Sequence, residues 1–335
     1  MDTAIVWSKD YELHATGSHP EGPDRVTRIV EYLRRTDLWP RLVEVAPRVA
    51  TRDEILLVHP ASHVDTIRRI AEGGGGEMDE TVISPQSYDI ALLAAGGVLT
   101  ALDQWEDGHV AFAAVRPPGH HATSTRVQGF CIFNNIAIAA RTLLDRGLER
   151  IAIIDWDVHH GNGTQAIFYE EPRVLFCSVH QWMLYPGSGW VDECGRGEGE
   201  GTTVNVALPS GSRDGDYADA FAKVVEPIVD QFAPEAVLVS AGFDPHVDES
   251  LASMRLSADG FALMALRTLR LAQRHAGGRL AFALEGGYDR EATGASVSAV
   301  LRALVDEAAP DVGHATVAGP SIERARQAQS RFWTL

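Results

Sequence analysis

The sequence predicts a single α/β domain with three layers, in which helices cover both faces of a mostly parallel sheet. Short apolar runs alternate along the chain with longer segments whose apolar residues recur at helical spacing, as in repeated β/α units. Several of these runs contain no polar residue, which is typical of parallel strands buried on both faces. No linker divides the 335 residues. One domain is therefore expected over residues 1–335, with residues 309–335 as a helical extension.

The first predicted element is a strand over residues 3–7, and a rigid loop after it leads to a helix that begins at Asp24. Thr51 and Glu54 have the spacing of a capping box, which opens a helix. Residues 73–80 combine four glycines with acidic residues and form either a flexible spacer, the favoured alternative, or the rim of a substrate opening. The remaining strands are predicted over residues 110–115, 151–154, 174–179, 204–208, 236–240 and 280–284. The remaining helices are predicted over residues 61–71, 84–103, 136–146, 165–169, 217–232, 259–276, 296–308 and 321–332.

The charge balance and the cysteines limit the partners and the compartment. The formal net charge is −17 and the sequence pI is about 5.1, which argues against sequence-independent binding to nucleic acid or to an anionic membrane surface. Cys131, Cys177 and Cys194 are odd in number and follow no CxxC spacing, so neither a disulfide framework nor a cysteine-based zinc site is expected. Residues 1–13 lack the pattern of a signal peptide and no stretch is long enough to span a membrane. We therefore expect a soluble cytoplasmic protein.

Polar chemistry begins where the apolar strand over residues 151–154 ends. Side chains alternate along an extended backbone, so Asp155, Asp157 and His159 are expected on one side of the chain. The glycines that follow allow a sharp turn, and Thr164 is a candidate cap for the next helix. This cluster is a solvated loop, a structural polar network or a metal site. The metal site is favoured, because ionisable groups beside an apolar strand are costly to bury without a cation.

A third candidate ligand arrives at the same edge of the sheet. Asp244 follows the predicted strand over residues 236–240, and the carboxyl ends of parallel strands meet at one crevice. Asp157, His159 and Asp244 would then provide three protein ligands, which leaves positions for water and substrate. That arrangement is expected of catalytic zinc.

The ends of two further strands supply groups for proton transfer. His120 and His121 follow the strand over residues 110–115, and Tyr288 follows the strand over residues 280–284. Imidazole has the side-chain pKa closest to neutral pH, and Asp155 and Asn162 can each orient one of the two rings. An aspartate raises the pKa of its histidine more than an asparagine does, so the two histidines can hold different protonation states. The Tyr288 phenol can donate to an oxyanion.

These motifs resemble those of the zinc-dependent histone deacetylase family. The resemblance runs from about Ile5 to Asp306, and Asn162, where class I members carry Asp, is typical of the class II branch, with the bacterial histone deacetylase-like amidohydrolases most similar. The motifs that carry it are Arg-Pro-Pro-Gly-His120-His121, Gly-Phe130-Cys-Ile-Phe-Asn-Asn, Asp155-Trp-Asp157-Val-His159-His-Gly-Asn162-Gly, Ala-Gly-Phe-Asp244 and Glu-Gly-Gly-Tyr288.

The resemblance implies the arginase/deacetylase fold and an amidohydrolase that removes acetyl or other acyl groups from N-acyl-lysine or related N-acyl amines. It implies that three side chains bind the catalytic Zn²⁺, namely Asp157, His159 and Asp244. By the same resemblance, His121 is the general base and acid, and His120 assists electrostatically together with Asp155. Tyr288 would donate a hydrogen bond to the substrate carbonyl and to its tetrahedral intermediate.

The resemblance also implies a substrate tunnel and a second cation site. Phe130 would form one wall of the tunnel and Tyr185, where relatives often have Phe, the other. Further residues assigned to substrate binding are Gly129, Leu251 and Gly287. The side chains that match a structural monovalent-cation site, usually K⁺, are Asp155, Asp157, His159 and Ser178. Arg25 matches an arginine at the floor of the pocket.

The substrate that the resemblance implies is an acyl-lysine peptide or protein, or a small N-acyl amine. The alternative function is that of an acetylpolyamine amidohydrolase, in which a Glu near the rim pairs with the distant ammonium. Leu251 occupies the matching position here, which favours lysine-type substrates, whereas Asp248, Glu249 and the acidic loop over residues 77–80 keep the polyamine alternative open. A metal-binding scaffold without turnover and a manganese-dependent ureohydrolase are disfavoured, because no catalytic residue is lost and no second set of metal ligands is seen. The sequence leaves open whether the chain forms a homo-oligomer.

Overall fold

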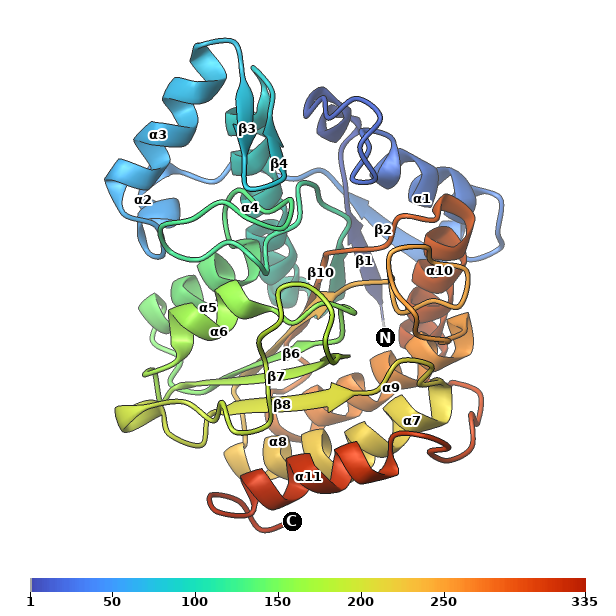
Figure 1. Cartoon of the computed structure of the whole chain (residues 1–335). Coiled ribbons are helices and arrows are strands. Elements are labelled where there is room, and N and C mark those ends of the chain that lie inside the picture. Colours follow the sequence, from blue (N-terminus) through green and yellow to red (C-terminus); the bar gives the residue numbers. More distant parts are fainter. Residues whose placement is uncertain (1) are drawn as a thin grey trace.

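The computed structural model describes residues 2–335 and is built around one eight-stranded parallel sheet (Figure 1). The strand order is β2-β1-β5-β10-β9-β6-β7-β8, and every neighbouring pair is parallel. The strands of this sheet are β1 (Thr3–Val6), β2 (Leu42–Val45), β5 (Val110–Ala113), β6 (Ile151–Asp155), β7 (Val174–Gln181), β8 (Thr203–Leu208), β9 (Ala236–Ala241) and β10 (Leu280–Leu284). The predicted three-layer α/β class is confirmed.

Helices cover both faces of the sheet (Figure 1). On one face lie α4 and α5, and on the other α9 packs against α10, which in turn packs against α1. The helices are α1 (Arg25–Arg34), α2 (Arg52–Leu56), α3 (Ala61–Glu72), α4 (Ser87–Asp103), α5 (Asn135–Asp145), α6 (Asn162–Phe168), α7 (Asp214–Ala220), α8 (Glu226–Phe232), α9 (Ala258–His275), α10 (Arg290–Asp306) and α11 (Gly319–Gln329). Short 3-10 helices cover Lys9–Leu13, Trp39–Arg41, Gln104–Asp107 and Gly197–Gly199. None of the helices in residues 2–335 is long and apolar enough to cross a membrane.

The glycine-rich segment over residues 73–80 is not a flexible spacer. It leads into an antiparallel hairpin of β3 (Gly76–Met78) and β4 (Thr81–Ile83). Asp79 and Glu80 form its turn with φ values of 44° and 61°. Glu80 lines a cavity of about 330 Å³, which agrees with the alternative interpretation of this segment as a rim; that a substrate enters there stays a prediction.

Several other element boundaries differ from the prediction, including the following three. The Asp157 backbone N–H donates to Asp155 Oδ1 (3.1 Å), and this local turn ends β6 at Asp155. Helix α6 begins at Asn162, so Thr164 lies inside it and is no cap. The predicted helix over residues 217–232 begins earlier and contains a π-helical turn, Phe221–Val225, between α7 and α8.

The C-terminal extension is joined to the sheet rather than separate from it. Helix α11 packs against β8, and Gln329 Nε2 donates to the Thr203 carbonyl (2.9 Å). Upstream of α11, one oxygen of Asp216 accepts from the backbone N–H groups of Val317 and Ala318 (2.9 Å each). Hydrogen bonds just before α11 and at its last residue, Gln329, therefore attach the extension to the rest of the domain.

Candidate active site

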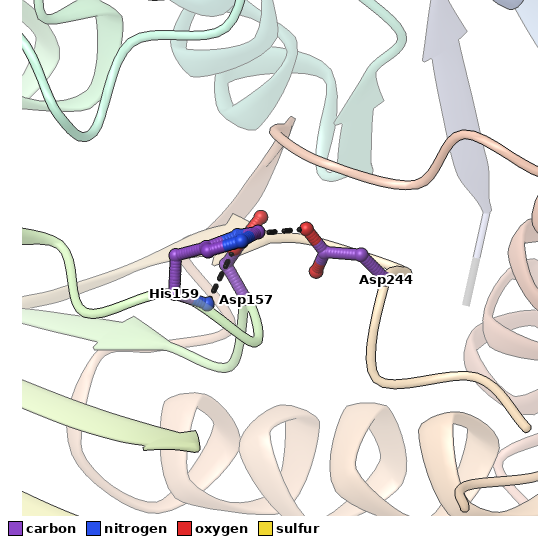
Figure 2. Close-up of side chains that lie close together, drawn as sticks. All are labelled: Asp157, His159 and Asp244. Atoms are coloured by element: carbon purple, nitrogen blue, oxygen red, sulfur yellow. Dashed lines mark hydrogen bonds and ion pairs between the residues drawn. The ribbon is translucent and has the colours of Figure 1, made fainter. Parts of the chain in front are cut away.

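The predicted metal ligands meet at the carboxyl edge of the sheet (Figure 2). His159 Nδ1 lies 3.1 Å from Asp157 Oδ1 and 3.1 Å from Asp244 Oδ2. The ligand atoms of the three residues all lie within 4.8 Å of one another. Trp156 and Val158, which alternate with these residues, are buried in the core. The alternation expected from the sequence thus separates the ligands from the apolar residues between them.

The donor set of these three residues fits a divalent cation. Asp244 Oδ1 accepts from the Val158 N–H (2.9 Å), but its Oδ2 is buried and receives no well-aligned hydrogen bond among the described residues. Burial and the charge of Asp157 raise the pKa of Asp244 to about 6, because two adjacent buried carboxylates repel each other. A Cβ at Gly286 would collide with the carboxylates of Asp157 and Asp244. A cation between these oxygens would relieve the repulsion.

The two histidines lie side by side with different partners. Their ring centroids are 4.0 Å apart. His120 Nδ1 lies 3.0 Å from Asp155 Oδ2, and His121 Nδ1 lies 2.8 Å from Asn162 Oδ1. Burial disfavours the charged form of both rings, but the carboxylates around His120, led by Asp155, overcome this and raise its pKa to about 10. Burial and the positive charges of its neighbouring imidazoles hold the pKa of His121 well below its usual value. The two pKa values are therefore shifted in opposite directions; Asp155 accounts for much of the rise at His120, whereas burial and the neighbouring imidazoles, not Asn162, account for the fall at His121.

Sequence reasoning missed Glu285, which holds the histidine loop in place. Its Oε2 accepts from the backbone N–H groups of Gly119 (2.7 Å) and His120 (3.1 Å), and its Oε1 accepts from Ser240 Oγ (2.9 Å). Burial raises its pKa to about 7. Glu285 directly follows β10, and this position at a strand end is the same signal that identified Asp244.

A cavity of about 330 Å³ reaches the candidate ligand His159. Its lining includes seven residues predicted from the sequence: His121, Gly129, Phe130, His159, Tyr185, Leu251 and Tyr288. Glu80 and Leu184 complete the lining. Leu184 lies beside Tyr185 in a long irregular loop, where position in the chain gives little indication of which residues face inward. Gly287 and the partners Asp155 and Asn162 are not among the lining residues.

Aromatic rings form the walls of the cavity. The Tyr185 ring lies 5.1 Å from the His121 ring, at an interplanar angle of 86°. The Phe130 ring lies 5.9 Å from the Tyr288 ring, at 87°, and the Phe130 N–H donates to Thr81 Oγ1 (3.0 Å). These contacts place one aromatic wall against His121 and the other against Tyr288.

The buried Arg25 side chain packs against the ring of Tyr288. Its guanidinium lies 4.8 Å from the centre of the Tyr288 ring. Arg25 Nε donates to the Gly287 carbonyl (2.9 Å), and one of its terminal nitrogens donates to the Glu285 carbonyl (2.7 Å). Gly287 therefore takes part through its carbonyl, which accepts from Arg25, and its φ of 115° lies in the region that favours glycine.

The predicted monovalent-cation ligands come from adjacent strands. Asp155 of β6 and Ser178 of β7 are paired in register, and Ser178 Oγ lies 2.9 Å from His180 Nδ1. Asp155 also contacts the Asp157 N–H, so the two candidate cation sites share one turn. The K⁺ site itself stays a prediction.

Comparison with known proteins agrees with this geometry. A model of the histone deacetylase domain matches residues 19–304. The chain belongs to the histone deacetylase family. A probable deacetylase of Archaeoglobus fulgidus is 42% identical over 296 residues, which cover 87% of this chain and 82% of that protein. A histone deacetylase-like amidohydrolase of Pseudomonas aeruginosa is 39% identical over 280 residues, which cover 82% of this chain and 73% of that protein.

A solved structure has the same fold as this chain. The crystal structure of the HDA15 HD domain superposes with a TM-score of 0.92 at 35% identity, and the match covers 99% of this chain and 95% of that chain. The arginase/deacetylase fold expected of a histone deacetylase-family protein is thereby confirmed. The relatives named above are a probable deacetylase and a histone deacetylase-like amidohydrolase, which supports a deacetylase or amidohydrolase activity of this family.

Proposed function

We propose that this histone deacetylase-family protein is a zinc-dependent hydrolase that removes acetyl or other acyl groups from acyl-lysine side chains. One observation carries the proposal: a single cavity is lined by a candidate metal ligand, a neutral histidine and a tyrosine phenol, namely His159, His121 and Tyr288. These are the groups that amide hydrolysis requires, because water must be deprotonated and the developing oxyanion stabilised.

Asp157, His159 and Asp244 would hold the zinc. The chemistry that zinc supplies when bound is polarisation of the acyl carbonyl and activation of a water molecule. Two of the ligands are carboxylates, which reduce the net charge of the site. Further donors are therefore needed at the carbonyl oxygen.

His121 is the proposed general base. The oxygen of an amide side chain only accepts, so the contact with Asn162 Oδ1 places the proton of the neutral ring on Nδ1. The lone pair is then on Nε2, which can take a proton from the attacking water and return it to the leaving amine. His120 stays charged beside Asp155 and contributes positive potential to the site.

Tyr288 is the proposed oxyanion donor. Burial raises the pKa of its phenol well above the usual value, so the hydroxyl stays protonated and can donate. The ring is fixed between Arg25 and Phe130. A donor held in this way needs no reorganisation during the reaction.

The cavity supports a lysine-type substrate over a polyamine. Leu251 lines the cavity at the position where polyamine-selective relatives carry a Glu. Glu249, two residues earlier, is buried and both of its oxygens accept backbone hydrogen bonds, so it is not available to an ammonium group. Acetylpolyamine hydrolysis remains the alternative, because Glu80 lies at the cavity.

We also propose a structural K⁺ bound by Asp155, Asp157, His159 and Ser178, and a cytoplasmic location. The register of β6 and β7 supports the first, and free, buried cysteines support a reducing compartment for the second.

The test is acetate release from an acetyl-lysine peptide and from N-acetylputrescine, measured in parallel with and without a chelator. We expect faster release from the peptide, loss of activity on chelation, and recovery when Zn²⁺ is restored. Faster release from the polyamine would establish the alternative substrate, and activity that survives complete metal removal would refute the zinc mechanism.

A further inference from the structure

We propose that Glu249 is a positioning residue whose carboxylate fixes the backbone of Tyr288 and so aims its phenol at the substrate carbonyl. The inference rests on the proposed function, because it assigns Glu249 a role in the step for which Tyr288 is the donor. It replaces the interpretation of Glu249 as an acidic rim residue that attracts a cationic substrate.

The carboxylate connects two loops through its two oxygens. Glu249 Oε2 accepts from the backbone N–H groups of Tyr288 (2.7 Å) and Asp289 (3.1 Å). Glu249 Oε1 accepts from the N–H of Ser250 (2.8 Å) and lies 3.4 Å from that of Leu251. The residue is 8% exposed. Hydrogen bonds from backbone amides to a buried ionised acceptor are among the stronger ones in proteins.

The Tyr288 segment needs this acceptor because it lies just before a helix. Asp289 is the N-cap of α10, and its side chain accepts from Ala292 N–H (2.8 Å). Amide groups at and before a cap have no carbonyl partner within the helix. Gly286 and Gly287 precede the tyrosine and allow the backbone wide freedom, so an anchor on the N–H side restricts where the phenol points.

Other contacts hold the carbonyl groups of the segment but not these N–H groups. Arg290 donates to the Tyr288 carbonyl (2.7 Å), and Arg25 donates to the Gly287 carbonyl (2.9 Å). Among the described residues, Glu249 is the acceptor for the Tyr288 N–H. Without the Glu249 carboxylate, the backbone around Tyr288 would be held only through its carbonyl groups.

The same carboxylate links the phenol to the metal-ligand loop. Glu249 lies five positions after Asp244, and its N–H donates to the His246 carbonyl (3.0 Å). Leu251, at the other end of this loop, lines the cavity. Glu249 thus connects the loop after Asp244, through its backbone, with the Tyr288 segment, through its carboxylate.

The test compares Glu249→Gln with Asp248→Asn in the zinc-loaded enzyme. Glutamine has nearly the same size, but its single oxygen cannot serve both loops. Asp248 is the neighbouring carboxylate, its side chain is 71% exposed, and it serves as the matched control. We expect Glu249→Gln to lower kcat on an acetyl-lysine peptide by roughly 10-fold or more, with KM changed less than about twofold and zinc content unchanged. Asp248→Asn should leave kcat within about twofold of wild type.

A double-mutant cycle separates positioning from general destabilisation. In a Tyr288→Phe background the phenol is already lost, so adding Glu249→Gln should lower kcat by less than about twofold. A loss that is equal in both backgrounds would overturn the proposal.

Amide hydrogen exchange provides a readout that does not depend on activity. We expect residues 286–290 to exchange faster in Glu249→Gln than in wild type or in Asp248→Asn, and unchanged exchange would overturn the proposal. A wild-type enzyme that releases no acetate would refute the proposed function, and the exchange comparison would then still decide whether Glu249 holds the Tyr288 segment.

Discussion

Replacing Asn162 with Asp should raise the pKa of His121 and move the acid limb of the pH–rate profile upward. His121 Nδ1 lies 2.8 Å from Asn162 Oδ1, and burial with two neighbouring imidazoles holds its pKa well below the usual value. A new carboxylate about 4 Å from the ring charge would contribute about 4 kcal/mol at an effective dielectric constant of about 20. At 1.36 kcal/mol per unit this is about 3 units. The cost of burying the new carboxylate reduces this shift, so we expect the pKa of His121 to rise by about 1–3 units.

The sign of the effect follows from the role of the ring. A general base must be neutral, so a higher pKa means that His121 is protonated over a wider acid range and that kcat/KM at low pH falls, by about tenfold for each unit. The assay is kcat/KM for an acetyl-lysine peptide across the acid limb. Gln86→Glu adds the same charge at an exposed position and should leave the limb unmoved. An Asn162→Asp enzyme with an unshifted acid limb would refute His121 as the base.

Three further outcomes are expected. Tyr288→Phe should lower kcat roughly 10²-fold or more with zinc retained, as for loss of an oxyanion donor; near-normal turnover would contradict that role. Asp244→Ala should abolish zinc retention, so a variant that still holds stoichiometric zinc by metal analysis would contradict the ligand assignment. Burial lowers the pKa of His59 to about 3. The stability that depends on the buried neutral ring is therefore fully present above about pH 6.5, the pKa in the unfolded chain, and is lost progressively as the pH falls from 6.5 towards 3. Denaturant unfolding should show that wild type loses about 2 kcal/mol more than His59→Asn between about pH 7.5 and pH 5; equal losses would contradict this.

The strands that could be predicted are the ones buried on both faces. The apolar run over residues 151–154 has the length and β-branched composition of a buried strand and lies in β6. Parallel order brings the carboxyl ends of such strands together whatever the spacing in the chain. The edge strand Leu42–Val45 and the hairpin of Gly76–Met78 with Thr81–Ile83 were missed or misjudged, because partly exposed short strands lack that pattern.

The side chains that act on the backbone could not be predicted in the same way. Asp157, His159 and Asp244 are recognisable because their chemistry is local to a strand end. Glu285 and Glu249 bind amides of residues that are distant in the chain, at positions that depend on the finished fold. A sequence shows a carboxylate but not the N–H groups that it will face.

This distinction bears on the substrate. Counting acidic residues near the cavity from the sequence gives several candidates to attract a distant ammonium, but Glu249 is engaged by backbone amides and the Asp248 side chain is 71% exposed, with His246 Nδ1 3.7 Å away. Of the acidic residues, Glu80 alone lines the described cavity, and it stands exposed on the turn of a hairpin. An exposed ion pair contributes about 0–1 kcal/mol, which is at most about a fivefold preference. The charge of Glu80 would therefore add little preference for a polyamine, and Leu251 in the lining of the cavity supports the proposed acyl-lysine substrate.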